Sequence, residues 1–64
     1  MEVFVQKNGQ TLQVQHEGTA AALLERLGVN PEVVLIVRDG ELITADEPVD
    51  GCKRLELLSV ISGG

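Results

Sequence analysis

The chain has 64 residues, 44% of them hydrophobic, and a net charge of −5 at neutral pH. This length allows one domain with a thin core, so we expect no buried active-site cleft. The acidic balance disfavours a nucleic-acid-binding protein, which needs a basic surface. Because no apolar run approaches the roughly 18 residues of a membrane span and no signal segment opens the chain, we expect a cytoplasmic protein without a membrane partner.

Two short runs of alternating hydrophobicity come first. Residues 2–6 place their valines on one face, and residues 11–15 do the same with Leu12 and Val14. Between the runs lies Asn8-Gly9, a dipeptide that tolerates the positive φ angles of a tight turn. The pattern predicts a β-hairpin.

A helix is predicted over residues 20–27, nearly all of which are strong helix formers. The apolar residues recur at i, i+3, i+4 and i+7, which makes one stripe of Ala20, Leu23, Leu24 and Leu27. Thr19 can cap the first turn with its hydroxyl. Gly28 suits the left-handed end of a helix, and Pro31 prevents the helix from continuing.

The rest of the chain contains three aliphatic segments, which we interpret as strands at residues 33–37, 41–43 and 55–60. The dipeptide Asp39-Gly40 predicts a turn between the first two of them. Residues 44–51 are polar and are typical of a loop. Residues 61–64 are expected to form a flexible C-terminal tail.

This order of elements predicts one domain, residues 1–64, of the α+β class with a β-grasp (ubiquitin-like) fold. A mixed sheet of four to five strands is crossed by one helix, which covers one of its faces. No element remains to cover the other face, and such open faces are normally polar. Apolar side chains on the open face would therefore be candidate contact points for a partner.

Candidates for catalysis are few. His16, the only histidine, lies in a loop beside Glu17 and is expected to be a solvated residue. Ser59 and Ser62 have no convincing histidine or aspartate partner. The pattern predicts no catalytic constellation around these residues.

The loop at residues 44–51 carries three carboxylates, Asp46, Glu47 and Asp50. They could in principle form an acid/base pair, but a thin core offers no obvious pocket that would shift their pKa values. A solvated, acidic loop is the favoured interpretation, and we expect no enzymatic activity.

Cys52 is the only cysteine, which excludes an internal disulfide. One cysteine and one histidine also fall short of a four-ligand zinc site, so no metal site is expected. Lys53 and Arg54 follow directly, and nearby cations can lower the pKa of a thiol. Two interpretations remain open, a role in handling sulfur and a plain exposed cysteine.

The chain ends in Ser62-Gly63-Gly64 directly after the last predicted strand. Glycines have no side chain, so such an end can thread a narrow channel in a partner and adopt the backbone geometry that an active site imposes. The terminal carboxylate of Gly64 can attack the α-phosphate of ATP, and the acyl-adenylate is then open to attack by sulfur or by an amine. We expect Gly64 to be the reactive residue, with Gly63 and Ser62 giving access to it.

Residues 33–43 and 55–64, together with the helix and Gly28, resemble the prokaryotic sulfur-carrier family of ubiquitin-like proteins. That family includes the thiamine-biosynthesis sulfur carrier, the small subunit of molybdopterin synthase and the archaeal and eukaryotic ubiquitin-related modifiers. The resemblance spans the whole chain, and its specific part is the tail. One departure is Cys52, where the family often has an acidic residue.

The resemblance implies a set of partners. An adenylyltransferase of the ubiquitin-activating type, using ATP and magnesium, would adenylate Gly64. A sulfur donor such as a cysteine desulfurase would supply sulfur for a thiocarboxylate, and a downstream synthase would accept it in thiamine or molybdopterin biosynthesis or in tRNA thiolation. The chain itself would bind no cofactor and would be a monomer when free.

Three functions remain open. A sulfur carrier and a protein modifier joined to target lysines both need Gly64, so the sequence does not separate them. A plain β-grasp binding module would not need the tail at all.

The docking surface is predicted from strand alternation. If Leu55 and Leu57 face the helix, Leu58 lies on the open face, and Val60 follows on the same side. In the strand at residues 33–37 the corresponding expectation is that Leu35 and Val37 face inward and Ile36 faces outward. This set predicts a partner-binding spot made of Ile36, Leu58, Val60 and Ile61, where acidic surroundings add electrostatic steering.

Overall fold

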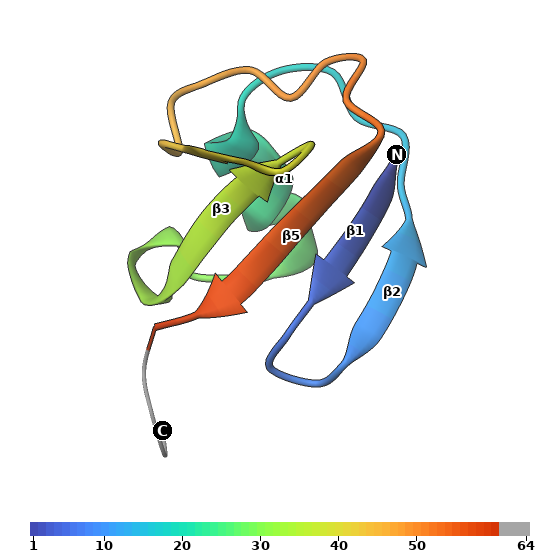
Figure 1. The fold of residues 1–64 in the computed structure, drawn as a ribbon. Helices are drawn as coiled ribbons and strands as arrows, with labels where there is room; N and C mark the ends of the chain where they lie inside the picture. Colours follow the sequence, from blue (N-terminus) through green and yellow to red (C-terminus); the bar gives the residue numbers. More distant parts are fainter. Residues whose placement is uncertain (61–64) are drawn as a thin grey trace.

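The computed structural model describes residues 1–60 and has the predicted β-grasp fold (Figure 1). Its elements are β1 (Glu2–Val5), β2 (Gln10–Gln13), α1 (Ala20–Leu27), the 3₁₀ turn η1 (Pro31–Val33), β3 (Val34–Arg38), β4 (Glu41–Ile43) and β5 (Arg54–Ser59). The five strands form one mixed sheet in the order β2-β1-β5-β3-β4. Helix α1 covers one face of the sheet, and the other face is open, as expected.

The hairpin and the helix form where their local signals predict them. Gly9 has a φ of +68°, and Asn8 accepts a hydrogen bond from the Gln10 N–H at 3.1 Å, which closes the β1–β2 turn. The Thr19 hydroxyl accepts the Ala22 N–H at 3.2 Å at the start of α1. At the other end Gly28 adopts a left-handed conformation with a φ of +72°, the usual device for ending a helix.

Strand β5 lies at the centre of the sheet and pairs on both sides. It runs parallel to β1, with Leu57 opposite Val5, and antiparallel to β3, with Leu57 opposite Ile36. Directly opposed residues point to the same face of a sheet, so all three side chains face α1. Leu55 and Leu57 are fully buried, which confirms their predicted inward orientation.

The core lies between α1 and the covered face of the sheet. Its buried side chains come from five elements and from the loop before β5, and they are Val3, Val5, Ala20, Leu23, Leu24, Ile36, Ile43, Val49, Leu55 and Leu57. Leu27 is partly buried and packs against this cluster. One buried valine, Val49, fixes the otherwise polar loop to the core, because the loop carries few other apolar groups.

The predicted orientation of β3 is wrong. Ile36 is only 3% exposed and belongs to the core, whereas Leu35 is 46% exposed on the open face. The continuous apolar run has no two-residue period of its own, so pairing decides its register. Leu57 faces α1 and its partner Ile36 must do the same, whereas Leu35 pairs with the outward-facing Leu58.

We expect Leu57→Ala to lower the free energy of unfolding by about 2–5 kcal/mol, because the fully buried side chain would leave a cavity at the centre of the core. Urea denaturation followed by circular dichroism measures this loss. Leu58→Ala, one residue along the same strand and on the open face, is the matched control and should cost about 1 kcal/mol or less. Equal losses for the two variants would show that β5 has the opposite orientation.

Candidate functional site

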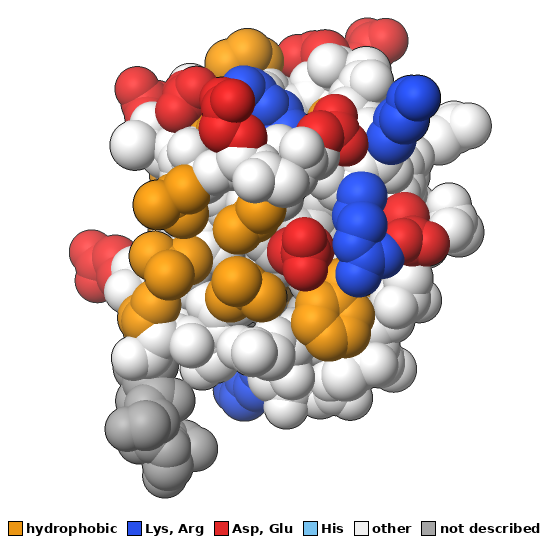
Figure 2. Space-filling model, viewed as in Figure 1, with side chains coloured by type: hydrophobic (Ala, Val, Ile, Leu, Met, Phe, Trp, Pro, Cys, Tyr) orange, Lys and Arg blue, Asp and Glu red, His pale blue; other side chains and the backbone are white. Residues whose placement is uncertain are grey.

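The open face of the sheet carries an apolar patch over β3, β4 and β5. We define the patch by its five side chains, Leu35, Val37, Leu42, Leu58 and Val60. Figure 2 shows hydrophobic side chains gathered on this half of the face, above the point where the chain leaves the last strand. The patch therefore extends to Val60, the last residue that the structure describes.

Strand pairing assembles the patch from residues that are distant in sequence. Leu58 of β5 lies opposite Leu35 of β3, and Val37 lies opposite Leu42 of β4. Leu42 is the most exposed of these residues, at 62%. Leu35, Leu42 and Val60 are all large exposed hydrophobic residues of this patch. Hydrophobic side chains on an ordinary surface are scattered singly, whereas a group of them is typical of an interaction site.

The predicted partner-binding residues divide into three groups. Leu58 lies on the open face as predicted, and Val60 is 48% exposed. Ile36 is buried and cannot contact a partner, which corrects its assignment. Ile61, like the tail residues 62–64, lies outside the described residues.

The sequence did not predict three members of the patch, Leu35, Val37 and Leu42. Leu35 was assigned to the wrong face because the register of its strand was unknown. Leu42 opposes Val37 across the Asp39-Gly40 turn and shares its face, so the wrong orientation of Val37 hid Leu42 as well.

The end of β5 is held firmly up to residue 60. The Val60 N–H donates to the Val33 carbonyl at 3.0 Å, and the Ser59 N–H donates to the Gln6 side-chain carbonyl at 2.8 Å. The last residue of η1 and the residue after β1 thus hold the point from which residues 61–64 continue. The distance between this point and the apolar patch is set by the sheet.

Charged side chains occupy the other part of the open face. Arg54 forms an ion pair with Glu2 on β1, and its guanidinium lies over the Phe4 ring, 5.6 Å from the centroid. Glu56 follows two residues later on the same side of β5, opposite both Phe4 and Val37. The face is therefore apolar toward β4 and charged toward β1.

The acidic loop has a structural role in the described chain. Glu47 accepts the Thr44 N–H at 2.9 Å, and Asp50 accepts the Gly18 N–H at 2.8 Å. Asp46 accepts a hydrogen bond from the Thr44 hydroxyl, and this bond holds the pKa of the Asp46 carboxyl below its usual value. These contacts tie the loop to Thr44 and to the segment before α1.

His16 is held by two neighbours. Arg26 on α1 contacts Nδ1 at 2.9 Å, and Nε2 lies 3.2 Å from the Thr19 carbonyl. Because arginine can only donate, Nδ1 accepts and Nε2 carries the proton that binds Thr19. The ring therefore connects the first loop to α1.

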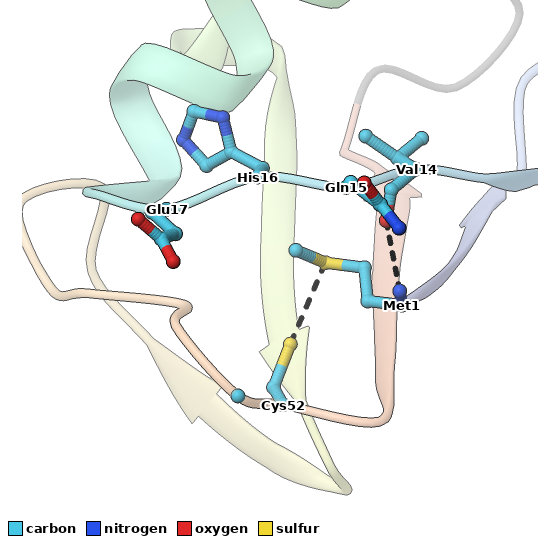
Figure 3. Close-up of a pocket in the computed structure, with 7 residues that line it drawn as sticks. Met1, Val14, Gln15, His16, Glu17 and Cys52 are labelled. Atoms are coloured by element: carbon cyan, nitrogen blue, oxygen red, sulfur yellow. Dashed lines mark hydrogen bonds between the residues drawn. The ribbon is translucent and has the colours of Figure 1, made fainter.

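Cys52 lies in a hollow of about 320 Å³ between Met1, the segment after β2 and the loop before β5 (Figure 3). Its thiol is 3.5 Å from the Met1 sulfur, and the His16 ring points toward α1 and not toward the thiol. Burial raises the pKa of the Cys52 thiol, and the negative charge of Asp39 raises it further. The pKa of the thiol is therefore not lowered by Lys53 and Arg54, and the contacts of Cys52 give no support to the sulfur-handling interpretation.

Residues 1–60 lack both a metal-ligand cluster and a membrane-spanning helix. This part of the chain brings together no group of three or more His, Cys, Asp or Glu side chains that could hold a metal ion. None of its helices combines the length and the apolar character that a membrane span requires.

The raised pKa of the Cys52 thiol predicts that this thiol reacts slowly with alkylating agents. We expect Cys52 in the folded protein to react with iodoacetamide more slowly than free cysteine at neutral pH, and its rate profile to shift to higher pH, because the thiolate is the reactive form. Mass spectrometry of the alkylated protein over a pH series gives the rates. The same protein unfolded in urea is the control and should react like free cysteine. A folded-state rate above that control would show an activated thiolate.

Known proteins were compared with the whole chain. The model of a family described as small archaeal modifier protein 2 matches residues 1–61. Sulfur carrier protein TtuB of Thermus thermophilus is 52% identical over 42 residues, which are 66% of this chain and 65% of TtuB. An uncharacterized protein of Archaeoglobus fulgidus is 36% identical over 63 residues, which are 98% of this chain and 81% of that protein. The chain therefore belongs to the small archaeal modifier protein 2 family of ubiquitin-like proteins.

Proposed function

We propose that this chain is a sulfur carrier whose Gly64 carboxylate is activated by an adenylyltransferase of the ubiquitin-activating type. The observation that carries the proposal is the membership of a ubiquitin-like family combined with a sequence that continues from β5 to Gly63-Gly64. The likeness to a sulfur carrier protein of Thermus thermophilus supports the same assignment. In this role the chain is a substrate of enzymes and not an enzyme.

The chemistry needs a carboxylate that can reach a foreign active site. An oxygen of Gly64 attacks the α-phosphorus of ATP, pyrophosphate leaves, and an acyl-adenylate forms. Magnesium bound by the activating enzyme would neutralise the phosphate charge in this step. Two residues without side chains let the carboxylate enter a narrow channel, while the body of the domain stays outside.

Sulfur transfer follows from the acyl-adenylate. If hydrosulfide attacks the Gly64 carbonyl carbon, AMP leaves and a thiocarboxylate forms directly. If the donor is a persulfide on a cysteine desulfurase, the product is an acyl disulfide, and a second thiol must reduce its S–S bond to release the thiocarboxylate. The acceptor in this proposal is a synthase of thiamine or molybdopterin biosynthesis or an enzyme of tRNA thiolation.

A second candidate function is protein modification, which the description of the matching family favours. The same acyl-adenylate, or a thioester formed from it, would be attacked by the ε-amine of a target lysine to give an amide. Mass spectrometry distinguishes the two functions. A carrier shows a mass shift that corresponds to sulfur in place of oxygen, whereas a modifier leaves a branch ending in Gly63-Gly64 on lysines of other proteins.

The apolar patch supports a docking step. It lies beside the end of β5, which hydrogen bonds hold up to Val60, so an enzyme seated on the patch would meet the tail at a defined distance. Val60 is hydrogen-bonded to Val33, and Leu35 of the patch follows two residues later in the chain. This segment therefore connects the apolar patch to the end of β5.

Deleting Gly64, or adding one residue after it, should abolish adenylation without changing the fold. The reason is that the carboxylate must reach the α-phosphate at one fixed distance from the docked domain. The measurement is ATP–pyrophosphate exchange with the activating enzyme of the same organism, alongside circular dichroism. Undiminished exchange with the extended chain would contradict the proposed chemistry, and full biological activity without Gly63 and Gly64 would favour a plain binding module.

A charge within the patch should weaken docking. We expect Leu58→Asp to raise the KM for this protein in the same exchange assay about tenfold or more, with kcat little changed, because the variant loses binding and not chemistry. Leu35→Asp should behave alike. Ile36→Asp is the contrasting variant and should unfold the domain, because it places an unpaired carboxylate in the core. A normal KM for folded Leu58→Asp would move the docking site elsewhere.

A further inference from the structure

Glu56 has an unusual position on the open face. It lies on the central strand β5, opposite Phe4 on one side and Val37 on the other, and Leu58 follows it on the same face. Its side chain is half-buried among these neighbours. A carboxylate thus borders the apolar patch at the middle of the sheet.

The neighbouring cations are already occupied. Arg54 is the nearest cation along the strand, but it is paired with Glu2 and stacked over Phe4. Arg38 is paired with acidic residues of β4 and of the loop after it. Its guanidinium lies 3.8 Å from a carboxylate oxygen of Glu41 and 3.9 Å from one of Glu47, and it donates to the Pro48 carbonyl at 2.7 Å. Within residues 1–60, the Glu56 carboxylate has neither an ion pair nor a hydrogen bond to another side chain or to the backbone.

The Glu56 side chain is partly exposed, so water can reach its carboxylate in the free protein. A partner that covers Leu58, Val37 and Leu35 would also remove this water, because Glu56 lies between Val37 and Phe4 in the same sheet face. An ionised carboxylate buried without a partner is strongly unfavourable. Binding over the patch therefore requires a positive group that reaches Glu56.

We propose that the surface that docks on the apolar patch belongs to the activating enzyme and carries an arginine or lysine side chain that pairs with Glu56. The identity of the partner rests on the proposed function, whereas the requirement for a cation rests on the unpaired carboxylate. Arginine fits best, because its planar guanidinium can bind both carboxylate oxygens while its flat faces lie against apolar neighbours.

The same charges disfavour a second copy of this chain as the occupant. Two patches in symmetric contact would bring acidic edges and the two Glu56 side chains toward each other, and the chain has a net charge of −5. Like charges at an interface without cations oppose association. Charge complementarity thus points to a partner with a basic group.

The test is the dissociation constant of the complex with the activating enzyme, measured by calorimetry without ATP. We expect Glu56→Gln to weaken binding about 30-fold or more, because the cation of the enzyme would be left buried and unpaired. Glu25→Gln is the matched control. Glu25 is an exposed residue of α1, on the covered side of the sheet, and its replacement changes the net charge equally.

The control separates local pairing from long-range attraction. A loss below about fivefold for Glu56→Gln, the range of exposed ion pairs, overturns the proposal. An equal loss for Glu25→Gln also overturns it, since net charge alone would then account for the effect. The thermal unfolding of both variants should match that of the natural protein.

A charge exchange supplies the second measurement. Glu56→Lys should not bind the natural enzyme, and one Arg→Glu or Lys→Glu variant of the enzyme should restore its binding while weakening that of the natural chain. If no Arg→Glu or Lys→Glu variant on the enzyme's docking surface restores the binding of Glu56→Lys, the proposed ion pair is overturned.

Failure of the proposed function has a different result. Tight, Glu56-dependent binding without adenylation would contradict the carrier chemistry and leave the cation site intact. Absence of binding by the natural chain, or self-association of the chain through the patch, would overturn the assignment of the activating enzyme as the occupant.

Discussion

Strand β5 is hydrogen-bonded to β1 on one side and to β3 on the other, and most of the structure depends on this double pairing. Its alternation sends Leu55 and Leu57 into the core and leaves Glu56 and Leu58 on the open face. Because directly opposed residues share a face, the orientation of β5 is imposed on both neighbouring strands. The same strand carries the chain to the residues that precede Gly63-Gly64. One register therefore decides the core, the apolar patch and the residue from which the chain continues to Gly63-Gly64.

This arrangement places two demands on a small sheet. The covered face must be apolar to provide a core in a domain of 64 residues, and the proposed docking role requires apolar surface on the open face as well. An exposed apolar face invites association with other chains. The acidic balance of the protein opposes this association, and the charged residues lie beside the patch on the same face (Figure 2). In the proposed docking role, the same charges would oppose self-association and favour a basic partner.

Residues with catalytic potential are used for structure in the described chain. His16 connects a loop to α1 through Arg26 and the Thr19 carbonyl. Asp50 holds the Gly18 backbone, and the thiol of Cys52 lies against Met1 with a raised pKa. In the proposed carrier the chemistry belongs to a backbone carboxylate, for which the domain needs only to provide an anchor and a docking face.

The sequence alone determined the hairpin, the helix and the inward face of β5. Asn8-Gly9, Thr19, Gly28 and the apolar periods act within a few residues, so their signals can be read locally. The orientation of Ile36 could not be read, because the aliphatic run has no period and only pairing with Leu57 gives it a register.

Charge pairing was hidden for the same reason. Arg54 binds Glu2, which is 52 positions away, and the thiol of Cys52 is affected by burial and by Asp39 more than by its cationic sequence neighbours. The sequence therefore indicated which residue types could carry the function. The tertiary structure decided which of them share a surface, because strand pairing brings together side chains whose separation along the chain is too long for any local pattern to specify.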